Sequence, residues 1–216
     1  MCGRYALAIK SGVKLAAAPL PDSVYSTPRY NVGPGQSVPI LTANGWERAH
    51  FGLVPAWAKS PGAGYTMINA RAETLMEKRT YSGLLKAHRC LIPASGFFEW
   101  EKAGKDKLPY YFTVKDAPII AFAGLWTERK DSEGVVLKSF TIITTEANEL
   151  LAKIHDRMPV ILDEAVQAEW LSLDGGDTVG LMSLLQPYPA AKMDSHRVST
   201  DVNKVSNDAA NLLNSL

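Results

Sequence analysis

The feature that most restricts the fold is a succession of short β-rich runs separated by turn residues, without regular alternation of strand and helix. Such runs, rich in β-branched and aromatic residues, are typical of strands. The runs cover residues 38–41, 46–54, 90–92, 96–100, 110–114, 119–126 and 139–144, with an extended segment at 67–70 and a short strand near 197–199. Because doubly wound sheets need βαβ alternation, we predict an α+β fold with a mainly antiparallel β-sheet core, either barrel-like or two packed sheets.

A few short helices complete this prediction. They are expected at residues 73–87, 147–154, 163–171 and 178–185. Asp163 should cap the third of them, since aspartate accepts hydrogen bonds from the free amides of a first helical turn. Proline and glycine make residues 19–37 and 55–64 rich in loops. With neither a repeat nor a biased linker in sight, we expect a single domain over residues 1–216.

Composition excludes several classes of protein. The 216 residues carry a net charge of +1, so nucleic-acid binding would have to come from local clusters of arginine. The two cysteines, Cys2 and Cys90, argue against a disulfide scaffold and suit a reducing compartment. Neither a zinc-ligand spacing, nor a signal peptide, nor an apolar run long enough to span a membrane is found. We therefore expect a soluble, cytoplasmic protein without cofactor or metal.

Cys2 stands immediately after the initiator methionine. If Met1 is removed, the chain begins with an α-amine (pKa about 7.7–8.0) and a thiol (pKa about 8.5) on adjacent carbons. This 1,2-aminothiol can trap an aldehyde, because the amine forms a Schiff base and the thiol closes a thiazolidine ring. It could instead act as an N-terminal nucleophile in amide hydrolysis. On position alone, an ordinary small residue near a frayed terminus is the simplest interpretation.

Three further residues could support such chemistry. Glu99 lies between aromatics, where burial would raise its pKa, although strand alternation favours a glutamate that faces solvent. His155 precedes a proline beside two charged residues and suits proton transfer, or else caps a helix. Asn69 could hold a terminal amine through its side-chain carbonyl, but a lone asparagine is more often a turn or cap residue.

Arginines accompany these segments. Arg4, Arg71, Arg79 and Arg157 lie in or near them. Arginine beside a nucleophile indicates an anionic substrate such as a phosphodiester backbone, and Trp57, in a proline-bounded loop, could stack on a base. Taken one at a time, a solvated arginine face and a core tryptophan remain the simpler interpretations.

Taken together, the segments resemble the SOS response-associated peptidase (SRAP) family over nearly the whole chain and in order. The matching motifs are MCGRY (1–5), RYNVGPG (29–35), FGLVPAW (51–57), INARAET (68–74), RCLIPASGFFEW (89–100), AGLW (123–126), TIITT (141–145), IHDRMP (154–159) and VN (202–203). Two positions depart from the family pattern and affect the stacking of bases: Phe51, where members often carry tryptophan, and Ala58, where some carry another aromatic.

The resemblance implies a sensor of abasic sites in single-stranded DNA. It assigns catalysis to Cys2, Asn69, Glu99 and His155, and DNA binding to Arg4, Arg71, Arg79, Arg157 and Trp57. In this interpretation the Cys2 amine, freed by loss of Met1, attacks the C1′ aldehyde of the opened deoxyribose. Asn69 steadies the amine, Glu99 relays the proton, and His155 protonates the sugar ring oxygen. The resulting covalent thiazolidine would protect the lesion from strand cleavage.

Two other functions remain open. The chain could be a thiol-dependent peptidase, acting mainly in its own maturation, or a non-catalytic module that binds single-stranded DNA. The expected partner is single-stranded DNA that contains abasic sites, which would associate the protein with the nucleoid. We expect neither a membrane nor an obligate protein partner, and a monomer.

Overall fold

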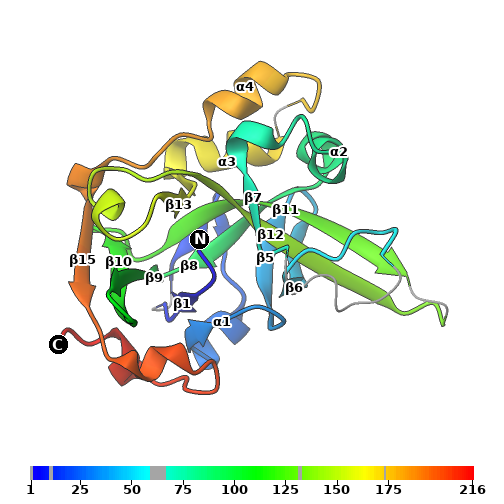
Figure 1. Cartoon of the computed structure of the whole chain (residues 1–216). Helices are drawn as coiled ribbons and strands as arrows, with labels where there is room; N and C mark the ends of the chain where they lie inside the picture. Colours follow the sequence, from blue (N-terminus) through cyan, green and yellow to red (C-terminus); the bar gives the residue numbers. More distant parts are fainter. Residues whose placement is uncertain (1, 10–11, 59–66, 131–132, 173) are drawn as a thin grey trace.

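The structure is a computed structural model that describes residues 2–9, 12–58, 67–130, 133–172 and 174–216. Its larger sheet closes on itself. In the described residues a ring of antiparallel pairs runs through β6 (Gly45–Phe51), β5 (Ser37–Thr42), β8 (Arg89–Ala94), β11 (Ile120–Lys130) and β12 (Val136–Glu146). A parallel pairing of β12 with β6 completes the barrel (Figure 1). The expected antiparallel α+β architecture is confirmed.

A second sheet brings the N-terminal segment into the middle of the molecule. Its order, among the described residues, is β15 (Met193–Arg197), β10 (Asp106–Val114), β9 (Gly96–Ala103), β1 (Tyr5–Leu7) and β4 (Arg29–Val32). Every neighbouring pair in it is antiparallel. Because β1 pairs on both sides, the chain just before it is held between strands rather than at an edge.

β9 approaches its neighbours closely because it begins with a glycine. Gly96 lies opposite Ala6 of β1. A Cβ atom on Gly96 would lie 2.5 Å from the Tyr111 hydroxyl and from the Phe112 carbonyl oxygen, closer than real Cβ contacts allow. A side chain at this position would therefore push β10 away from the strand that carries Glu99.

The remaining elements lie around the two sheets. β7 (Asn69–Arg71) pairs in parallel with β12, and β13 (Arg157–Pro159) pairs with the end of the same strand. The others are β2 (Lys14–Leu15), β3 (Ala18–Pro19), β14 (Ile161–Leu162), α1 (Asp22–Ser26), α2 (Arg79–Ala87), α3 (Glu164–Ser172), α4 (Thr178–Ser183) and the 3-10 turns Ala72–Thr74, Leu151–Lys153, Ala190–Lys192, Thr200–Asn203 and Ala210–Leu213. No helix in the described ranges has the length and apolar character needed to cross a membrane.

Several expected boundaries were wrong. The helix expected at 73–87 begins only at Arg79, because a 3-10 turn over Ala72–Thr74 precedes it. The helix expected at 147–154 is only a 3-10 turn over Leu151–Lys153, before which the Asn148 side chain accepts hydrogen bonds from the amides of Leu150 and Leu151. The loop-rich stretch 19–37 contains α1 and β4, and the strand expected near 197–199 ends at Arg197.

The helices of the C-terminal half are close to expectation. α3 begins directly after Asp163, whose backbone carbonyl accepts the amide of Val166. The Asp163 carboxylate accepts hydrogen bonds from the Tyr188 hydroxyl at 2.6 Å and from Lys192 at 3.3 Å, which ties the helix start to the chain that follows α4. The strands expected at 96–100 and 110–114 are present as β9 and β10, which pair with each other and are both longer than expected.

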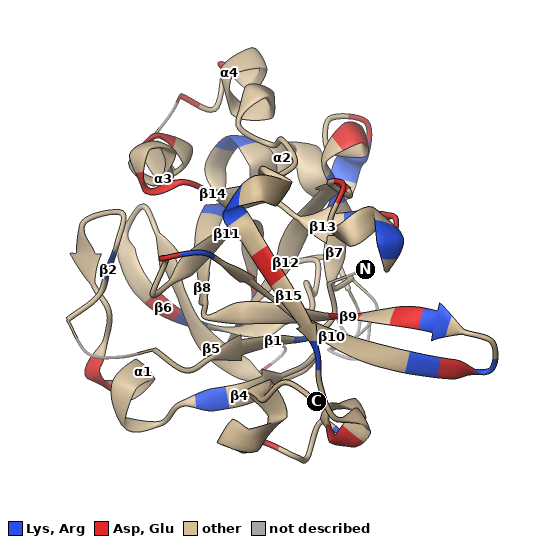
Figure 2. Cartoon of the chain, turned by 90° about the vertical axis from the view of Figure 1, so that its left-hand side faces the viewer, with Lys and Arg blue, Asp and Glu red and all other residues tan. Residues whose placement is uncertain are grey.

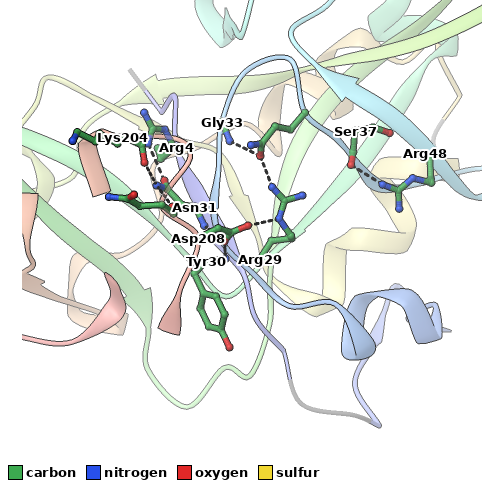
Figure 3. A network of polar contacts seen from close by, with 11 residues as sticks. Arg4, Arg29, Tyr30, Asn31, Gly33, Ser37, Arg48, Lys204 and Asp208 are labelled. Atoms are coloured by element: carbon green, nitrogen blue, oxygen red, sulfur yellow. Dashed lines mark hydrogen bonds and ion pairs between the residues drawn. The ribbon is translucent and has the colours of Figure 1, made fainter. Parts of the chain in front are cut away.

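The C-terminal segment covers the outer face of the second sheet. Phe98 and Tyr111 pack there with Val198, Val202 and Leu212 in a small cluster separate from the main core. One carboxylate fastens this segment to β4: Asp208 accepts hydrogen bonds from the Arg29 guanidinium and from the backbone amides of Tyr30 and Asn31 (Figure 3). The C-terminal segment therefore buries the face of β9 that would otherwise be exposed to solvent.

We predict that Asp208→Ala lowers the free energy of unfolding by about 2 kcal/mol, because three hydrogen-bond donors lose a charged acceptor. Urea denaturation measures this change. Asp194→Ala is the control. Within the described residues the Asp194 carboxylate makes only a long surface ion pair of 3.7 Å with Lys115, so this substitution should cost less than about 0.5 kcal/mol. Equal losses of unfolding free energy in the two variants would contradict the proposed role of Asp208 in fastening the C-terminal segment to β4.

Candidate functional site at the N-terminal strand

Cys2 is fully buried at the entry to β1. Its backbone carbonyl accepts a hydrogen bond of 3.0 Å from the side-chain amide of Asn69, which begins β7. Burial raises the pKa of the Cys2 thiol far above its ordinary value, and the nearby Glu99 charge acts in the same direction. The thiol is therefore protonated at neutral pH. The interpretation of Cys2 as a residue near a frayed terminus is wrong.

Glu99 faces the interior, so the solvent-facing alternative is also wrong. It is 2% exposed. Strand alternation does hold, because Phe97 packs in the main core while Phe98 packs in the small cluster under the C-terminal segment. Both faces of β9 are covered at this point. Burial raises the pKa of Glu99 from 4.5 to about 7, which suits a group that exchanges protons near neutral pH.

His155 lies next to Asp156, whose charge acts on Glu99. Its Nδ1 atom accepts the backbone amide of Arg157 at 3.0 Å, so the neutral ring carries its proton on Nε2. The Asp156 carboxylate also lies 2.9 Å from Nδ1, but it is 83% exposed and can turn toward water. Burial lowers the pKa of His155, which favours the neutral imidazole.

Contacts and electrostatic coupling link the four residues that the sequence assigned to chemistry. The hydrogen bond joins Cys2 to Asn69, and the Glu99 charge acts on Cys2. Asp156, which the sequence did not single out, acts on Glu99 and touches His155. The Asn69 side-chain oxygen is buried and accepts no hydrogen bond from the described residues. It is thus an open acceptor next to Cys2.

The arginines fall into two groups. Arg71 and Arg79 are exposed and form no ion pair within the described residues. Arg4 and Arg157 are partly buried and already engaged: Arg4 donates to the Asn31 side chain at 2.8 Å and to the Val202 carbonyl at 2.6 Å, whereas Arg157 binds a carboxylate. Figure 2 shows basic and acidic positions interspersed on this side of the chain, as the net charge of +1 suggests.

Asn31 is a residue that the sequence analysis missed as an individual, although it lies in a matching motif. It is fully buried, and its side-chain amide donates to the carbonyls of Val202, Lys204 and Asn207 at 3.1, 3.1 and 2.8 Å. Figure 3 shows Asn31 beside Arg4 and Lys204. Its side-chain oxygen accepts a hydrogen bond from the Arg4 guanidinium. It therefore fixes both the C-terminal segment and the arginine that follows Cys2 and Gly3.

The aromatic positions are sorted by their exposure. Trp57 is 75% exposed, so its ring is available to a base. Phe51 is 1% exposed and stacks on Phe140 with ring centroids 5.2 Å apart, and Ala58 is also buried. The two departures from the family pattern therefore affect core packing, not the stacking of bases. Residues 59–64 of the expected loop lie outside the described residues.

We predict that Glu99→Gln changes the pH dependence of stability. Because the folded pKa of about 7 lies above the ordinary 4.5, Glu99 favours folding below about pH 4.5 and loses this contribution as the pH rises through 7. The glutamine variant should therefore gain roughly 3 kcal/mol relative to the parent between pH 4 and pH 8. Urea denaturation at both pH values measures it, and a pH-independent difference would contradict a buried carboxyl of raised pKa.

Comparison with known proteins identifies the family of the chain. The family model "SOS response associated peptidase (SRAP)" matches residues 1–205. The abasic site processing protein YoqW of Bacillus subtilis is 43% identical over 201 residues, 91% of this chain and 89% of its own, and YedK of Escherichia coli is 31% identical over 99% of both chains. A crystal structure of a Bacteroides thetaiotaomicron protein, 33% identical, superposes with a TM-score of 0.80 over 87% of this chain and 85% of its own. The chain belongs to the SRAP family.

Proposed function

We propose that this protein captures abasic sites in single-stranded DNA as a covalent thiazolidine, through Cys2 after Met1 has been removed. The observation that carries the proposal is the burial of Cys2 beside the Asn69 amide and a Glu99 carboxyl whose pKa is about 7. Relatives named abasic site processing proteins, such as YoqW, support the choice of lesion.

The reaction forms two new bonds, C–N and C–S, to the same carbon atom, C1′ of the sugar. The Cys2 amine adds to the C1′ aldehyde of the opened sugar, and the carbinolamine loses water to form an imine. The thiol sulfur then adds to the imine carbon while its proton passes to the nitrogen. The net change is the loss of one water molecule. Ring closure removes the imine that would otherwise promote β-elimination and strand cleavage.

Each polar group has a distinct role in this proposal. The Asn69 side-chain oxygen accepts a hydrogen bond from the amine, which keeps the lone pair of the amine nitrogen directed at the aldehyde. Glu99, with its pKa near neutrality, takes and returns the protons of carbinolamine formation and dehydration. Neutral His155 would donate a hydrogen bond from Nε2–H to the sugar ring oxygen during opening, and its protonated fraction would supply the proton that this oxygen takes up. The buried thiol enters as a neutral group and loses its proton only on attack.

The DNA contacts follow from exposure and charge. Arg71 and Arg79 would bind phosphates on either side of the lesion, Arg4 would present the guanidinium hydrogens that its protein contacts leave over, and Arg157 would also bind the backbone. Trp57 would stack on a base. A buried Cys2 can reach C1′ only if the strand bends and exposes the sugar, which favours single-stranded over stiff duplex DNA.

A second activity concerns maturation, because Met1 precedes Cys2 in the sequence. The Cys2 sulfur could attack the Met1 carbonyl carbon, so that the amide nitrogen leaves as the protonated amine and a thioester forms; water then releases methionine and restores the thiol. The Asn69 contact to the Cys2 carbonyl would hold the peptide for this attack. Removal by a separate aminopeptidase would produce the same terminus.

We predict that protein lacking Met1, verified by intact mass, forms a band of reduced mobility with an abasic oligonucleotide on a denaturing gel. Cys2→Ala should abolish this band, because the C–S bond that closes the ring needs the thiol, and the imine that the remaining α-amine could form is hydrolysed again. Cys90→Ala, at the other buried cysteine, should keep it. An equal band for Cys2→Ala, or none for the parent, would sink the proposal and leave a non-catalytic binding module or a peptidase.

We also predict that Asn69→Ala slows crosslinking by about tenfold, the effect of one lost hydrogen bond of roughly 1.4 kcal/mol. Quenched time courses at saturating abasic DNA measure the rate. Affinity for an intact strand serves as the control and should stay unchanged. If instead the affinity falls and the saturated rate does not, Asn69 binds DNA and does not position the amine.

A further inference from the structure

Arg157 is already bound to a carboxylate in the DNA-free protein. Its Nη1 and Nη2 atoms donate to the two carboxylate oxygens of Glu73 at 2.7 and 3.0 Å, a bidentate pair. Nη2 also donates to the Thr144 carbonyl at 2.7 Å. The Nε atom is buried and has no acceptor among the described residues. The pair of guanidinium nitrogens Nη1 and Nη2, called the fork below, is therefore occupied by Glu73.

A phosphate would use the same fork. Arginine binds phosphate and carboxylate in the same planar, two-point manner. If Arg157 binds the DNA backbone, as proposed above, the phosphate and Glu73 compete for one pair of donors. The competition holds at neutral pH, because the hydrogen bond from Arg157 lowers the pKa of Glu73 and keeps its carboxylate ionised.

Glu73 is the partner that can leave. The Arg157 side chain is only 12% exposed and is also held by Thr144, whereas the Glu73 side chain is 50% exposed and sits on a single 3-10 turn. A carboxylate released from the pair can be hydrated without any change in the sheet. Arg71, which acts on the same carboxylate, lies two residues before it in the chain.

We propose that Glu73 is a specificity-determining residue that occupies the phosphate position on Arg157 and is exchanged for a DNA phosphate when a strand binds. The inference rests on the proposed function. The exchange weakens the non-covalent hold on every strand by the same amount. An undamaged strand is then released, while an abasic strand is kept by the covalent bond to Cys2.

The chain offers a matched control for this idea. Glu146 lies opposite Arg157 in the pairing of β12 with β13, is exposed, and forms no ion pair within the described residues. Glu73→Gln and Glu146→Gln change the net charge equally and in the same neighbourhood. Any difference between them therefore isolates the contact with Arg157 from general electrostatic attraction.

The test measures binding of an intact fluorescent single strand, which needs no covalent step, over a series of salt concentrations. Glu73→Gln should bind at least about fivefold more tightly than Glu146→Gln, with a log–log salt slope steeper by up to about 0.7, since one more phosphate charge is neutralised without a competing carboxylate. With excess undamaged DNA present, Glu73→Gln should crosslink an abasic strand more slowly than the parent. Melting curves confirm that the variants are folded.

The outcomes separate this inference from the proposed function. Equal affinities for the two variants, or weaker binding by Glu73→Gln, overturn the exchange even if the parent crosslinks normally; weaker binding would mean that Glu73 orients Arg157 for the phosphate. Tighter binding by Glu73→Gln supports the exchange at Arg157 even if the parent forms no crosslink, a result that would overturn the covalent function alone.

Discussion

The site depends on the placement of β1 between two partner strands. β1 pairs with β9 on one side and β4 on the other, and the Phe98 amide donates to the Arg4 carbonyl just outside the strand. Terminal segments usually fray unless they are tied into a sheet. Here pairing on both sides carries the chain before Tyr5 inward, so Cys2 is buried and adjoins groups from β7 and β9.

Burial then sets the chemistry of the buried groups. The carboxyl and the thiol are buried and the imidazole is partly buried, and each responds by favouring its neutral form. Neutral groups can exchange protons with one another without first losing hydration. The same desolvation lowers the free energy of unfolding at high pH, where the buried carboxyl must ionise. Packing in the core of the barrel and under the C-terminal segment offsets that cost. Around this region the arginines remain at intermediate or high exposure, where a charged strand can reach them.

The C-terminal segment contributes to the site from a distance. Its carbonyls accept the Asn31 amide and the Arg4 guanidinium, and Asp208 fastens it to β4 (Figure 3). Arg4 lies 5.8 Å from the centre of the Trp100 ring, whose indole nitrogen donates to Asn203. One network of contacts therefore connects the C-terminal segment, Trp100 of β9 and Arg4.

The sequence by itself predicted which residues would carry chemistry and determined most of the strands. Motif order identified the roles expected of Cys2 and Asn69, and β-rich runs located strands such as β5 and β11 closely, because both signals are local in the chain. Helix boundaries such as Arg79 escaped prediction, since a 3-10 turn over Ala72–Thr74 and the extended backbone of Lys78 interrupt a run of helix-forming residues.

Only the tertiary structure decided which faces are interior and which cations are free. Alternation correctly separated Glu99 from Phe98, but it could not show that the chain end covers one face and the barrel the other. Nor could it show that Arg157 is paired with Glu73, far away in the sequence. Burial and pairing depend on long-range packing, whereas periodicity reports only the relative orientation of neighbouring side chains.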